Sequence, residues 1–134
     1  MALPPLLSER PPTQQRVIPI AGPIIGGILT GLALGVSEGL WALANIIMIL
    51  GGVAAGFDHL GAAEGARRGL LGGTIFGIAL LLTDAVSGMS REAKLPDPAI
   101  LLLVVTIVAG TLLGALGGAL RARTQARRAP AGAA

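Results

Sequence analysis

Long apolar runs without charged residues are the feature of this sequence that most restricts its possible folds. Residues 17–36 are twenty uncharged residues, about 30 Å as an α-helix, which matches the hydrocarbon thickness of a bilayer. Residues 40–57 and 99–120 also lack charge, and residues 69–83 form a shorter run of fifteen. Backbone inside a bilayer must satisfy its own hydrogen bonds, as helices do. The runs therefore predict an all-α polytopic membrane protein, a bundle of four transmembrane helices.

Composition agrees with this class and excludes several others. The chain is 53% hydrophobic and 13% charged, with a mean hydropathy of +0.79, which is unlike an ordinary soluble domain. It has no cysteine, so disulfides, thiolate metal sites and a cysteine nucleophile are excluded. The sequence pI is near 11.1, but the net charge is only +3, and we expect no nucleic-acid partner.

Charge and proline positions set the expected boundaries. We expect spans at about 17–37, 40–57, 60–86 and 98–120, with Asp97 as the N-cap of the last and Pro98 in its first turn. Residues 1–16 contain four prolines and predict a disordered cytoplasmic tail. Residues 121–134 predict a basic cytoplasmic tail, also disordered.

The distribution of Lys and Arg predicts the orientation. With four spans, the two tails and the middle loop share one side of the membrane, and that side carries eight of the ten basic residues. The other side carries only Arg91 and Lys94. The excess of basic residues predicts that both termini are cytoplasmic. A cleavable signal peptide is the alternative interpretation of the first run, but the run is long and lacks a small-x-small cleavage site.

Glycines recur at four-residue intervals at the start of the third span. Residues four apart share one helix face, and glycine there lets a neighbouring backbone come close. The fourth span carries a shorter series. The predicted helix-packing residues are Gly61, Gly65, Gly69, Gly73, Gly77, Gly110, Gly114 and Gly118. Such faces serve packing within one bundle, assembly with a second copy or a partner membrane protein, or sliding of helices.

The glycine series also predicts that the third helix starts near Leu60, inside the polar loop. In that register Glu64 can pair with Arg68 at i+4 and with Arg67 at i+3. Asp58 is then the expected N-cap of this helix.

Few residues offer chemistry. Glu38 and Asp84 fall at the same membrane face, either as solvated interfacial residues or as the mouth of a cation path. Asn45 is the only amide within a span, and we expect it to hydrogen-bond a neighbouring helix or to belong to the same ion path. His59 lies beside Asp58, but the i, i+4 ligand spacing of zinc helices is absent.

These observations favour a non-enzymatic protein without catalytic residues, cofactor or metal, whose first partner is the lipid bilayer. The expected function is a structural or accessory membrane subunit, and the alternative is a small channel or transporter for an ion or small solute. Four short helices are similar to small multidrug-resistance transporters and dual-topology fluoride channels. However, the transporter family has a carboxylate within its first helix, whereas Glu38 lies at the end of the first run of this chain.

Overall fold

The computed structural model describes residues 3–128, and within them the regular structure is helical throughout. Four helices are long and apolar enough to cross a membrane. The elements are the 3-10 helix η1 (Leu7–Glu9) and the α-helices α1 (Pro12–Leu34), α2 (Glu38–Phe57), α3 (Ala62–Ser87) and α4 (Leu101–Arg128).

The N-terminal boundary differs from the prediction. Helix α1 begins at Pro12, five residues before the expected span, and η1 precedes it, so residues 7–16 are not the expected disordered segment. Proline is well suited to the first turn of a helix, where its missing N–H loses no bond. Leu7 is buried and its backbone N–H donates to the Asp58 carbonyl at 3.0 Å, which fixes η1 against the bundle.

The next two helices start close to their predicted positions. The Ser37 hydroxyl caps α2 by accepting from the Leu40 N–H at 3.1 Å. Helix α3 begins after Gly61, whose φ of 101° favours glycine, and ends at Gly88 in the left-handed conformation. Asp58 was expected to cap α3, but that prediction is wrong, because Asp58 is the residue that ends α2.

Helix α4 starts later and ends later than expected. Asp97 is not its N-cap, because residues 97–100 form bends and a turn in which the Leu101 N–H donates to the Pro98 carbonyl. The helix continues through Arg121 to Arg128, so the prediction of disorder is wrong for residues 121–128. Arginine, alanine and glutamine dominate this stretch and are strong helix formers. Residues 129–134 lie outside the described part of the chain.

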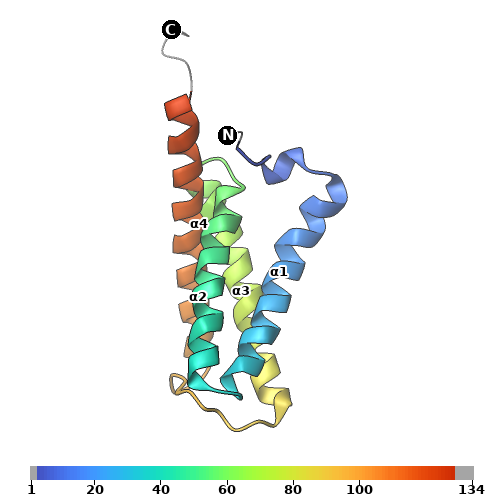
Figure 1. Cartoon of the computed structure of the whole chain (residues 1–134), viewed down its shortest axis with the longest axis vertical. Helices are drawn as coiled ribbons and strands as arrows, with labels where there is room; N and C mark the ends of the chain where they lie inside the picture. Colours follow the sequence, from blue (N-terminus) through green and yellow to red (C-terminus); the bar gives the residue numbers. More distant parts are fainter. Residues whose placement is uncertain (1–2, 129–134) are drawn as a thin grey trace.

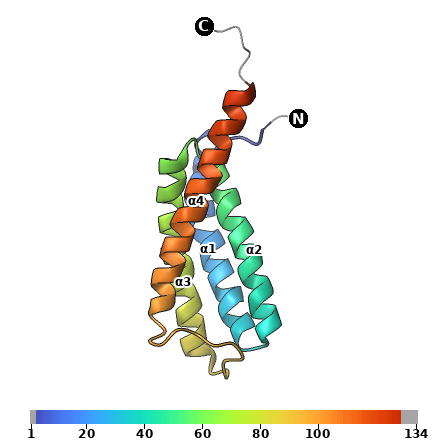
Figure 2. The ribbon, with the colours of Figure 1, turned by 90° about the vertical axis from the view of Figure 1, so that its left-hand side faces the viewer.

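The four helices run alternately up and down and form a bundle (Figure 1). Helix α3 packs most extensively on α4 and also on α1, α2 packs on α4, and α1 and α4 take diagonal positions (Figure 2). We call one end of the bundle the termini end; it holds η1, the α2–α3 connection and the end of α4. The other, the loop end, holds the α1–α2 turn and residues 88–100.

Burial in this bundle is the reverse of that in a soluble protein. Among the described residues, the largest fully buried side chains are only Thr30, Leu34 and Leu80. Large apolar side chains are exposed on all four helices, and only 6% of the most apolar stretch of α2 is buried. Such extensive apolar surface is not stable in water and indicates a membrane environment.

Candidate functional site

The closest helix contact is a seam between α3 and α4. A Cβ placed on Gly65, Gly69 or Gly73 of α3 would overlap a backbone carbonyl of α4. A Cβ on the facing glycines of α4 would likewise overlap a carbonyl on the α3 side, whereas a Cβ on Gly61 would meet nothing within 4 Å. The facing pairs are Gly61 with Gly118, Gly65 with Gly114, Gly69 with Gly110, and Gly73 with Thr106. The Gly61 N–H also donates to the Gly118 carbonyl at 3.2 Å. We call these residues the glycine seam.

Gly77 continues the register, but its contacts are different. A Cβ there would overlap the Thr106 hydroxyl and approach Leu103 Cδ1 at 2.8 Å. The contact is therefore with side chains, which can move more easily than a backbone.

Other glycines divide into close and open positions. Gly27 faces the Phe76 carbonyl, with a Cβ-to-oxygen distance of 2.6 Å, where α1 crosses α3. Gly56 faces Gly114 where α2 meets α4. In contrast, a Cβ on Gly22 or Gly51 would meet nothing within 4 Å. Tight approach therefore belongs to particular helix faces and not to every glycine.

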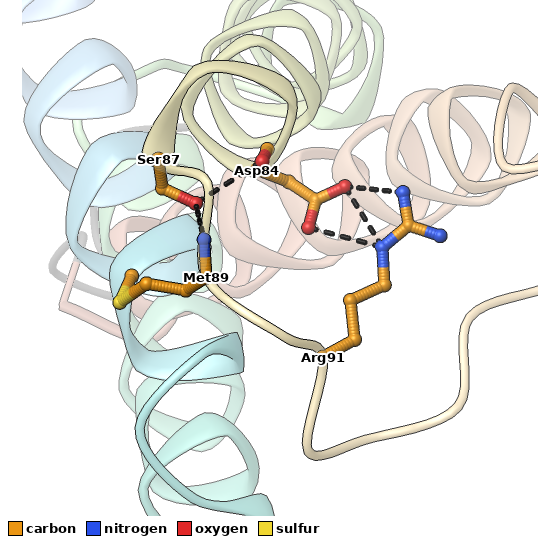
Figure 3. A network of polar contacts seen from close by, with 4 residues as sticks. All are labelled: Asp84, Ser87, Met89 and Arg91. Carbon is orange, nitrogen blue, oxygen red and sulfur yellow. Dashed lines mark hydrogen bonds and ion pairs between the residues drawn. The ribbon is translucent and has the colours of Figure 1, made fainter.

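Asp84 is held in a polar network at the loop end (Figure 3). Its carboxylate accepts two hydrogen bonds at 3.0 Å from the Nε of Arg91 and a third from Nη2, and its side chain is 7% exposed. The Ser87 hydroxyl donates to the Asp84 carbonyl and accepts from the Met89 N–H. Hydrogen bonding to Asp84 raises the pKa of Arg91 above its ordinary value. This pairing neutralises Asp84.

The other two candidate ion-path residues do not join Asp84. Glu38 is exposed in the first turn of α2. Asn45 donates to the Trp41 carbonyl of its own helix at 2.8 Å, instead of to a neighbouring helix. None of these three residues lines either of two clefts that open at the termini end of the bundle.

Two neighbouring clefts open at the termini end. The larger, about 460 Å³, is lined by the N-terminal segment, α1, the α2–α3 connection and α3. Its lining residues are Leu7, Pro19, His59, Glu64, Arg67, Arg68 and Leu71. The smaller, about 400 Å³, shares Leu7, His59 and Glu64 with it. We call the larger one the arginine cleft.

The charges around the arginine cleft are paired differently from the prediction. Among the described residues, Glu64 forms no ion pair with Arg67 or Arg68, and neither arginine has another ion pair or hydrogen bond. Asp58 instead accepts from the Arg10 Nη2 at 2.8 Å. These two arginines therefore have donors available to a ligand.

His59 takes part in a local contact. Its Nδ1 donates to the Ala55 carbonyl at 3.1 Å, at the end of α2. Across the described residues, no cluster of three or more histidine, aspartate or glutamate side chains could hold a metal ion.

Arg121 is a further residue that sequence reasoning missed. It is 3% exposed, its guanidinium carbon lies 5.4 Å from the centre of the Phe57 ring, and within the described chain its Nε and Nη1 are buried without a hydrogen-bond partner. The available signal was its position directly after the apolar run, with Phe57 at the end of another.

Together these features define an all-helical protein with four candidate membrane spans, which indicates a membrane location. Models of known protein families, curated proteins and solved structures gave no match to the chain.

Proposed function

We propose that this is an integral membrane protein that acts as a structural or accessory subunit, with its bundle held together by the glycine seam and both termini in the cytoplasm. It carries out no catalysis, and its exposed apolar faces contact lipid, a second copy or a partner membrane protein. The observation that carries the proposal is the backbone contact along the glycine seam. The contact extends over the four facing pairs of the seam. Small residues there allow dispersion contacts and Cα–H···O interactions between the helices that lipid cannot replace.

Two alanine substitutions of opposite expected sign test the role of the seam. Gly69→Ala places a methyl group against the Gly110 carbonyl, so we expect a loss of about 1–3 kcal/mol in the free energy of unfolding. Gly51→Ala meets open space on α2, so we expect no loss and a gain of up to about 1 kcal/mol from helix propensity. Both are measured by denaturant unfolding in detergent micelles. Equal stability of the two variants would show that the seam does not hold the bundle.

A flux measurement separates the structural function from the alternative, a small channel or transporter. Asp84 is paired with Arg91 and Glu38 is exposed at the start of α2, so they supply no continuous polar path. We therefore expect protein-containing liposomes to pass Na⁺, K⁺ and H⁺ no faster than empty ones. Flux above that background, abolished by Glu38→Gln with Asp84→Asn, would contradict the structural function and support transport. The Arg123→Gln variant is the control, because Arg123 is exposed on the end of α4.

A further inference from the structure

The glycine seam fixes the height of Arg67 and Arg68 in the bundle. Gly69 faces Gly110 and Gly65 faces Gly114, so Arg68 lies level with Thr111 of the antiparallel helix. From that level to Arg121, α4 continues for about ten residues, or about 15 Å. Leu112, Leu116 and Leu120 in this stretch are exposed, at 65%, 50% and 39%. On this side of the bundle, the two arginines therefore lie well inside the level at which the apolar surface of α4 ends.

Helix α2 is also uncharged beyond the height of the two arginines. Gly52 contacts Leu113 and Gly56 contacts Gly114, so the level of Arg68 falls near residue 51 of α2. From there α2 is uncharged up to its end at Phe57, and Ala54 of that stretch is exposed. Beyond the height of the arginines, α4 thus presents exposed leucines and α2 carries no charge.

A guanidinium at that depth is costly unless it reaches water or an anion. The structure provides an opening beside it, because α1 leans away from the other helices at the termini end (Figure 1) and the arginine cleft lies there. Pro19 and Leu71 form apolar walls of this cleft. Arg68 reaches toward α1, since its Nη1 and the Pro23 ring both lie near Gly72. The cleft is therefore apolar at its sides and cationic along α3.

This combination identifies the chemistry of a ligand. Arg67 and Arg68 both line this cleft, and a guanidinium group offers a planar set of donors that matches phosphate oxygens. Among the described residues that line the arginine cleft, Glu64 is the only carboxylate against two arginines, and the nearby Asp58 is already paired with Arg10, so positive charge is in excess. Apolar walls favour a phosphate attached to a hydrocarbon chain over free phosphate.

We propose that the arginine cleft binds the phosphate group of an anionic phospholipid, with Arg67 and Arg68 as donors and the acyl chains along α1 and α3. The inference rests on the proposed membrane location. Asp58 attracts Arg68 only at longer range, and lipid from the surrounding leaflet supplies the directly hydrogen-bonded anion that neither arginine has within the described chain.

The experiment is native mass spectrometry of the full chain, purified in detergent and titrated with phosphatidylglycerol. The variant is Arg67→Gln with Arg68→Gln, and the matched control is Arg123→Gln with Arg127→Gln, which removes two exposed arginines from the end of α4. We expect the first variant to weaken lipid binding at least about tenfold, since charge-assisted hydrogen bonds are lost, and the control to change it less than about twofold. Equal weakening by the two variants would overturn the site.

A gain-of-binding variant keeps the test valid should the first variant misfold. Glu64→Gln removes the one carboxylate of the cleft, and we expect it to tighten phosphatidylglycerol binding about threefold or more through reduced repulsion. Unchanged or weaker binding would contradict the proposal. Inorganic phosphate is added as a competitor: we expect no displacement at equal concentration, and displacement would overturn the lipid as occupant.

Alkaline carbonate extraction of membranes separates the two levels of inference. If the parent chain is extracted as a soluble protein, the proposed membrane function fails. If it stays in the membrane but the Arg67→Gln with Arg68→Gln variant binds lipid normally, only the lipid site fails.

Discussion

At the scale of single residues, Arg121 shows how a charge can be accommodated directly after the apolar run of a helix. Burial of a guanidinium without hydrogen-bond partners is unfavourable, yet Arg121 is 3% exposed. The Phe57 ring, 5.4 Å from the guanidinium carbon, offers the negative face of its π-system. Phe57 is also the last residue of α2, where unpaired carbonyls carry partial negative charge. Both effects favour a cation at this position.

The contact of Arg121 with Phe57 gives a prediction at the same scale. Phe57→Leu keeps an apolar side chain but removes the ring, so we expect a coupling free energy of about 1–2 kcal/mol in a double-mutant cycle with Arg121→Met. The measurement is denaturant unfolding of the four proteins in detergent. A second cycle of Phe57→Leu with Arg123→Met is the control, because Arg123 is exposed. A coupling no larger than that of the control would show that the ring contact contributes nothing.

At the scale of elements, the existence of each helix was predictable, but several of its ends were not. Residues 40–57 match α2 closely, because an uncharged run bounded by Ser37 and Asp58 leaves little choice. The glycine register likewise placed the start of α3 within two residues, although its apolar run begins only at residue 69. Periodicity and length are local properties, and they carry this information.

The errors came from residues whose roles depend on tertiary contacts. Asp58 has the right residue type for a cap of α3, but in the fold it ends α2 and pairs with Arg10 of the N-terminal segment. Asp97 has the same type, but α4 starts four residues later, at Leu101. Residues 121–128 have good helix propensity, yet their charge suggested a disordered tail.

The candidate site was less predictable than the fold. Glu38, Asp84 and Asn45 were selected as ionisable or polar groups near apolar runs, but Arg91 pairs with Asp84 and Asn45 bonds within its own helix. The arginine cleft depends on the tilt of α1 away from the bundle and on the register of α3 against α4. Neither property can be predicted from the sequence of one helix alone.

At the scale of the whole molecule, the bundle separates two chemically different ends. The termini end carries the arginine cleft, the Arg10–Asp58 ion pair and the basic end of α4. The loop end is closed by residues 88–100, where the Glu92 N–H donates to the Leu34 carbonyl at 3.0 Å and Ala93 is buried. Because basic residues favour the cytoplasmic side, this polarity predicts one orientation in the membrane instead of two.

Cysteine labelling tests this orientation with little background, because the natural chain has no cysteine. Ser8→Cys and Ala126→Cys place thiols at the termini end, and Ser90→Cys places one at the loop end; all three positions are exposed. In intact cells we expect a membrane-impermeant maleimide to label Ser90→Cys and to spare the other two, which react only after the membrane is permeabilised. The excess of eight basic residues against two favours this arrangement, since moving the arginine-rich end across the bilayer is unfavourable.

Partial labelling of all three variants in intact cells would instead reveal dual topology, and labelling confined to Ser8→Cys and Ala126→Cys would invert the proposed orientation. Either outcome would place the arginine cleft against the outer leaflet, wholly or in part, and change which lipids it meets.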